Sequence, residues 1–223
     1  MLLEGAGLAA ATTLLAWRWR RDQILLREQR RGFVAGCLGL LREPSLTQQG
    51  ADYPVLRGLY RGHNVELRPL ADTLALRKLP ALWLSVTVEG PTGAPGVIDA
   101  LLRPTGAEHW SPSERLPHRL PTPPSLPETV LLRADGDAAG ALLPLLPAGF
   151  LGSTHAKEAL ITPKGVRLVV LVDEAERGPY LVLRQARFAT AELDADGARS
   201  LLEQATALHT AVRTRRPALG LAA

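Results

Sequence analysis

The residues that could do acid–base or metal chemistry are spread along the chain. The histidines are His63, His109, His118, His155 and His209. None stands near another histidine or a cysteine at the spacing of a strong metal motif, and His155 has only Glu158 three residues on. That pair is expected in a solvated loop. The sequence therefore predicts no catalytic residue, no metal ligand and no cofactor.

Motifs for covalent or phosphate chemistry are also missing from the sequence. It contains no GxSxG, no Walker A and no GxGxxG pattern. Ser153, Thr154 and His155 place hydroxyls beside an imidazole, but neighbouring residues rarely face each other productively. Enzymatic activity is therefore not expected, although an enzyme with a site that carries no local motif stays open as an alternative.

One group of basic side chains is the candidate contact for an anion or a partner. It comprises Arg57, Tyr60, Arg61, Arg68, Arg77 and Lys78. Arginine and lysine bind phosphates, and a tyrosine among them could stack on an RNA base. The alternative is a solvated sheet face on which these cations pair with Glu66, Asp72 and Glu89. Because the domain as a whole is not basic, nucleic acid is not expected as a partner.

The positive charge of the chain is concentrated near its N-terminus. The net charge is +4, and the segment from Arg18 to Glu43 holds seven arginines and three acids, which accounts for all of it (7 − 3 = +4). A basic segment beside an apolar one is typical of a membrane surface. The single cysteine, Cys37, excludes an internal disulfide and is expected to be a buried small hydrophobe.

Residues 1–21 are predicted to be a transmembrane anchor helix. The expected membrane interface is formed by Trp17, Arg18, Trp19, Arg20 and Arg21. Arginines after the apolar stretch predict a single-pass protein of the bacterial inner membrane with its domain in the cytoplasm. The membrane, or another membrane-associated protein, is then the expected partner. As a helix, the stretch up to Trp17 spans about 25 Å against ~30 Å of hydrocarbon, so a soluble amphipathic or oligomerising helix is the alternative.

Residues 22–44 are predicted to be an amphipathic, basic helix. Its apolar stripe comprises Leu26, Phe33, Val34, Cys37, Leu38 and Leu41. This segment either continues the first helix or follows a break near Gly32, and Pro44 ends it.

Residues 45–223 are predicted to be an α+β domain. Strands are expected over 55–60, 65–70, 82–89, 97–103, 129–134, 159–162, 166–173 and 180–188. A Pro-rich loop, 104–128, interrupts them, and helices are expected over 138–146 and from Asp194 or Asp196 to about Arg216. Strands without βαβ alternation favour an antiparallel sheet built from hairpins with helices packed on one face, preceded by a long N-terminal helix.

Several segments carry a resemblance to a known kind of protein. They are RGLYRGHNVEL (57–67), DTLALRKLPALWLSVTV (72–88), LLRPTGAE (101–108) and ITPKGVRLV with YLVLRQARF (within 161–188). These segments resemble uncharacterised bacterial single-pass membrane-anchored α+β proteins. The resemblance implies no known activity and supplies no site residue. The expected function is a membrane-anchored, cytoplasm-facing binding or scaffold domain, and the alternative is a soluble enzyme or a nucleotide- or RNA-binding domain.

Overall fold

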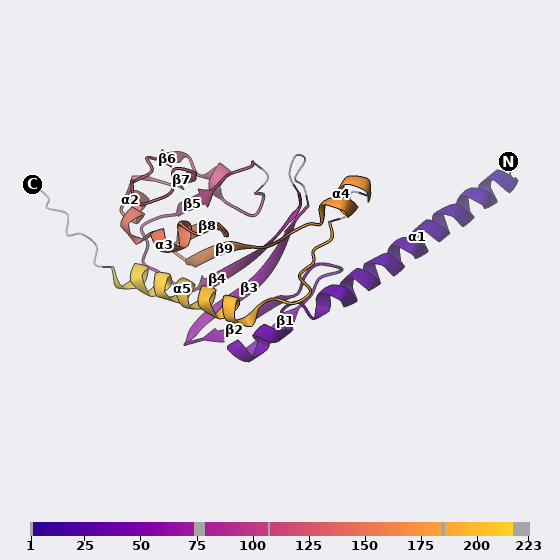
Figure 1. Cartoon of the computed structure of the whole chain (residues 1–223), viewed down its shortest axis with the longest axis horizontal. Helices are drawn as coiled ribbons and strands as arrows, with labels where there is room; N and C mark the ends of the chain where they lie inside the picture. Colours follow the sequence, from indigo (N-terminus) through magenta and orange to yellow (C-terminus); the bar gives the residue numbers. More distant parts are fainter. Residues whose placement is uncertain (1, 74–78, 107, 184–185, 216–223) are drawn as a thin grey trace, which may run out of the picture.

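The chain forms one antiparallel sheet with helices beside it and a long helix projecting from it (Figure 1). The computed structural model describes residues 2–73, 79–106, 108–183 and 186–215. Within these ranges, nine strands are ordered β1-β2-β3-β4-β9-β8-β5-β7-β6. The predicted α+β class and the long N-terminal helix are confirmed.

The strands are β1 (Arg42–Thr47), β2 (Val55–Tyr60), β3 (His63–Asp72), β4 (Ala81–Glu89), β5 (Ile98–Leu102), β6 (His118–Leu120), β7 (Val130–Ala134), β8 (Ala156–Thr162) and β9 (Gly165–Glu174). The α-helices are α1 (Leu2–Arg31), α2 (Asp137–Gly140), α3 (Ala148–Leu151), α4 (Arg177–Leu183) and α5 (Ala195–Thr214), and the 3₁₀ helices are η1 (Ala35–Leu40), η2 (Ser113–Arg115) and η3 (Leu143–Leu145).

Alternation along the strands gives the sheet one apolar and one polar face. The apolar face is formed by buried aliphatic side chains such as Leu67, Val86, Ile98 and Leu168. Helix α5 covers this face, contacting β4 and β9, and the Asp194 carboxylate caps its first turn by accepting from the backbone N–H of Asp196 and Gly197. The hydrophobic core therefore lies between the sheet and α5, which leaves the other face for polar side chains.

The residues after α1 belong to this core. Helix α1 ends at Arg31, and Phe33, Val34 and Cys37 are at most 1% exposed. The backbone N–H of Leu193, just before α5, donates to the Phe33 carbonyl over 2.7 Å. Of the two alternatives for this region, the structure has the break near Gly32. Cys37 is buried as expected, and burial, with the nearby Asp194 and Glu192 charges, raises its pKa to about 11.

Two local predictions were wrong. Residues 180–188 were expected to form a strand, but Arg177–Leu183 is the helix α4, and residues 184–185 lie outside the described ranges. The reason is topological: β9 already pairs with both β4 and β8, so a strand directly after it finds no neighbouring edge. Residues 42–44 were expected as the end of a helix, but Arg42–Thr47 forms β1 against β2.

The predicted membrane span is also wrong. Within the described part of the chain, no helix is long and apolar enough to cross a bilayer. The cause is that the apolar stretch is short and arginines follow Trp17 at once, at Arg18, Arg20 and Arg21. The single-pass anchor, the inner-membrane location and the orientation predicted from residues 1–21 are therefore not retained.

Truncation distinguishes the two parts of the N-terminal region. A chain without residues 1–21 should keep a cooperative thermal transition, because side chains from Thr12 to Arg21 are exposed and lie outside the core. A chain starting at Ser45 loses Phe33, Val34 and Cys37 from the core and should lose its cooperative transition. Thermal melts followed by circular dichroism measure both. A cooperative melt of the Ser45 chain within a few degrees of the full chain would contradict this assignment.

Candidate anion-binding site

The polar face of the sheet extends from β2 to β7. Cross-strand partners place Arg57, Glu66, Thr87, Arg167, Leu160, Asp99 and Arg133 in one row. A parallel row begins with Arg68 and Ser85. Such a row of charges on a nine-stranded sheet is unusual for a packed face, so each charge needs a partner or a ligand.

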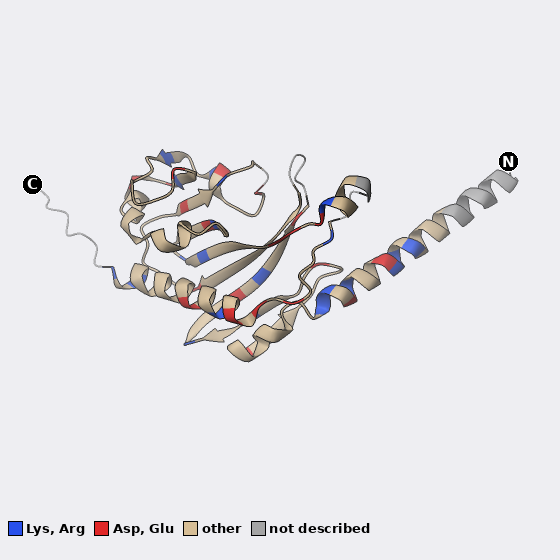
Figure 2. Ribbon diagram, in the orientation of Figure 1, with Lys and Arg blue, Asp and Glu red and all other residues tan. Residues whose placement is uncertain are grey.

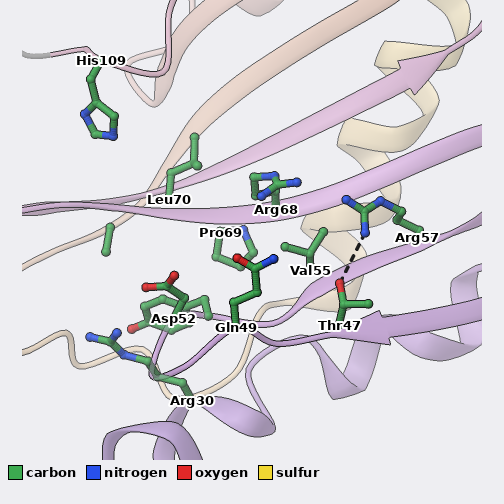
Figure 3. A pocket seen from close by; sticks show the side chains of 12 residues that line it. Arg30, Thr47, Gln49, Asp52, Val55, Arg57, Arg68, Pro69, Leu70 and His109 are labelled. Atoms are coloured by element: carbon green, nitrogen blue, oxygen red, sulfur yellow. Dashed lines mark hydrogen bonds between the residues drawn. The ribbon is translucent and has the colours of Figure 1, made fainter. Parts of the chain in front are cut away.

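A cavity of about 300 Å³ lies at the β1–β3 end of this face (Figure 3). Three arginines line it: Arg30 from the last turn of α1, Arg57 from β2 and Arg68 from β3. Its other lining residues are Thr47, Gln49, Asp52, Tyr53, Val55, Pro69, Leu70, Ala71 and His109. Guanidinium groups from three separate elements thus meet around one hollow.

Glu66 fixes two of these arginines. Its carboxylate accepts from Arg68 Nε at 2.7 Å and from Arg68 Nη2 at 3.1 Å, and it also pairs with Arg57 Nη2. Arg57 Nη1 donates to Thr47 Oγ1 at 3.3 Å. Burial alone would raise the pKa of Glu66, but the hydrogen bonds and charges of Arg68 and Arg57 outweigh it and lower the pKa. The carboxylate therefore stays charged and holds both guanidinium groups in place.

Arg30 is fixed by different contacts. Its Nη1 donates to the Ala51 carbonyl at 2.7 Å, and its guanidinium lies 4.6 Å from the centre of the Tyr53 ring. Figure 3 shows Arg30 at the opposite end of the cavity from Arg57 and Arg68, close to Asp52. The cavity therefore has a cation at each end.

His109 reaches the cavity from the segment 103–118, which lies over the β5–β9 part of the polar face. A buried ion pair holds this segment: Lys157 Nζ contacts Glu108 Oε1 at 2.6 Å, and both side chains are about 5% exposed or less. Lys157 also donates to the carbonyls of Leu102 and Arg103 at 3.0 Å. Burial would raise the pKa of Glu108, but hydrogen bonds from Lys157 and Thr105 lower it to about 2. The residue next to His109 is thus anchored in the interior.

A second buried group holds the same segment further along. Ser111 Oγ donates to Asp99 Oδ2 at 3.0 Å, and Asp99 is fully buried on β5. Glu158, also fully buried, accepts from Arg167 Nε at 2.7 Å and Nη2 at 3.0 Å. Burial and the Glu158 charge raise the pKa of Asp99 to about 8, against the opposing effects of Ser111 and Arg167. Asp99 is therefore largely protonated at neutral pH, which relieves the repulsion between the two carboxyl groups.

The predicted basic group is divided between two places. Arg57 and Arg68 line the cavity, whereas Tyr60 and Arg61 lie at the other end of β2, where Arg61 Nη2 pairs with Glu203 of α5 at 2.7 Å. Arg77 and Lys78 lie outside the described residues. Of the expected acidic partners, Glu66 is the one that pairs with cavity arginines.

Sequence reasoning did not find Arg30, Asp52 or His109 as members of this site, because they come from segments far apart in the chain. It also missed His63 and His209, whose rings lie 5.2 Å apart edge to face. The sequence did contain a signal for the buried polar groups that hold the segment 103–118. Asp99 interrupts the apolar run from Val97 to Leu102, and Lys157 and Glu158 interrupt the apolar run of residues 156–161. A charge inside a buried strand indicates a specific partner.

Comparisons of the chain with family models, with curated proteins and with solved structures gave no match. The resemblance to a family of single-pass membrane-anchored proteins is therefore corrected, since no family model supports it and no described helix can span a bilayer. The argument for function accordingly depends on the geometry of the cavity.

The raised pKa of Asp99 predicts a pH dependence of stability. Its folded-state pKa of about 8 lies above the ordinary 3.8, so the folded state binds the extra proton and the free energy of unfolding falls as pH rises from about 4 to about 8. One group changes the unfolding equilibrium constant by at most about tenfold per pH unit. Asp99→Asn should remove this slope. Urea unfolding of both proteins at pH 5, 6.5 and 8 measures it, and parallel pH profiles would contradict the prediction.

Proposed function

We propose that this protein is a binding domain for an anionic ligand, which it holds in the cavity between α1, β2 and β3. The observation that carries the proposal is the convergence of Arg30, Arg57 and Arg68 on one hollow of about 300 Å³. The volume suits a phosphate or carboxylate group with a small attached moiety, since small-molecule pockets begin near about 300 Å³.

The charge balance supports an anion. The three arginines face Asp52 and the neighbouring Glu66, so these five residues sum to +1 (3 − 2). Glu66 does not cancel the site, because its side chain is 12% exposed and lies beneath the arginines, whose side chains are 41% and 43% exposed for Arg57 and Arg68. An anion arriving from solvent therefore meets guanidinium groups first.

Unused hydrogen-bonding capacity supports the same ligand class. Arg68 commits Nε and Nη2 to Glu66, and its Nη1 makes no hydrogen bond to a described residue. Guanidinium groups match the oxygens of phosphates and carboxylates in pairs, and prior fixing of the arginines lowers the entropy cost of binding. Thr47, Gln49 and His109 add polar groups around the same space.

The anion could come from several sources that share this chemistry. A free phosphate, a nucleotide and an acidic peptide each present oxygens that the arginines can bind. A nucleotide would also place its base against Tyr53, which already stacks under Arg30 at 4.6 Å. The binding assay below separates these sources by comparing inorganic phosphate, ATP, citrate and a glutamate-rich peptide.

Replacing one cavity arginine should weaken binding sharply. Arg68→Ala removes a guanidinium and leaves Arg57 paired with Glu66. The affinity for whichever of the four anions binds the wild-type chain most tightly should therefore fall at least tenfold. Isothermal titration calorimetry of the full chain at low ionic strength measures the dissociation constants, with thermal melts to verify folding.

Arg61→Ala is the matched control, because Arg61 is on the same hairpin and pairs with Glu203 away from the cavity. It should leave the affinity unchanged within twofold. Equal loss in both variants would mean that the ligand responds to net charge alone, and an unaffected Arg68→Ala would rule out the cavity.

A further inference from the structure

A second hollow lies on the opposite side of the sheet, between the start of α5, α3 and β9. It has a volume of about 540 Å³ and is open to solvent. Apolar side chains form its floor, among them Leu84, Phe150, Val170, Val172 and Leu201. Glu192 and Asp194 stand among its lining residues, and none of the described residues that line it is a lysine or an arginine. It is an apolar groove with acidic side chains.

Helix α1 has the complementary properties. Its described part exposes Leu14, Leu15, Trp17, Trp19, Ile24 and Leu25 by 56% to 67%. Between them in the sequence lie Arg18, Arg20 and Arg21 against Asp22, an excess of two positive charges (3 − 1). Figure 2 shows blue along this helix and red at the start of α5. Large apolar side chains left in water mark an interaction surface.

The groove cannot be filled by α1 of the same chain. Helix α1 runs unbroken for 30 residues, about 45 Å, and points away from the sheet (Figure 1). Its last turn is tied to the body through Arg30 to Ala51 and Gln48 to Arg27. Folding back onto the groove would require breaking the helix, whereas a second molecule can present its α1 without any change of shape.

We propose that the chain forms a homodimer in which the exposed apolar segment of α1, residues 14–26, docks in the groove of a second copy. The apolar side chains of the helix cover the groove floor, and its arginines approach Glu192 and Asp194. Both copies carry both surfaces, so two equivalent contacts close a symmetric dimer. This inference is independent of the anion site, since the groove lies on the other face of the sheet.

The oligomeric state of the full chain is the first test. Analytical ultracentrifugation should find a dimer at micromolar concentration. Leu15→Glu and Ile24→Glu should each weaken the dimer at least tenfold without changing the circular dichroism spectrum of the folded chain, because both side chains are more than 60% exposed. Leu181→Glu, which changes a 60% exposed leucine on α4, is the matched control and should leave the dimer intact. A monomer at 100 μM would overturn the proposal.

Crosslinking tests where the helix docks. Leu15→Cys or Leu25→Cys chains are mixed with Ser200→Cys chains and treated with a bismaleimide, since Ser200 is an exposed residue of the groove. Burial and a pKa of about 11 keep the native Cys37 from reacting. The mixture should give a helix-to-groove dimer. If the only crosslinks join α1 of one chain to α1 of the other, the groove is not the docking site. The groove would also be excluded if an apolar probe binds in it without dissociating the wild-type dimer.

Discussion

The ammonium group of Lys157 lies at a β-bulge of β8, where the register against β9 shifts between Ala156 and Glu158. The bulge turns this side chain beneath the segment 103–118, where Lys157 Nζ meets Glu108 and two backbone carbonyls. A buried ammonium is tolerated only when its N–H groups are satisfied. That requirement fixes the path of the segment, and with it the position of His109 at the edge of the cavity.

The same constraint explains why the polar face of the sheet stays ordered. Glu158 is paired with Arg167, Asp99 is held by Ser111, and Glu66 is shared by Arg57 and Arg68. Buried ion pairs contribute little net stability, but removing one partner leaves an expensive unpaired charge. The carboxyl groups on this face therefore act mainly by positioning: each one orients a guanidinium group or holds a covering segment in place. At the β1–β3 end three arginines face the two acids Asp52 and Glu66, and there the cavity opens.

The elements that the sequence predicted correctly are those whose structure is determined by neighbouring residues. Alternating apolar residues located β4 and β9 well, and the sequence around Asp194 located the start of α5, because period and capping are properties of neighbouring residues. The helix α4 and the strand β1 were missed, since their states depend on which sheet edges are already taken. The membrane prediction was wrong because the apolar stretch before Arg18 is shorter than a bilayer span and the helix continues into arginine-rich sequence.

The cavity itself was only half predictable. Arg57 and Arg68 stand on the two adjacent strands of one hairpin, so their shared face followed from the alternation of β2 and β3. Arg30 arrives from the end of α1 and His109 from a segment held by Lys157, contacts that no local pattern specifies.

The most direct test of the account is to locate a bound anion by amide chemical-shift mapping of the full chain titrated with phosphate. Shifts should concentrate at residues 47–57, 68–71 and 109. Shifts distributed along the arginines of α1, with none at Arg57 and Arg68, would contradict it.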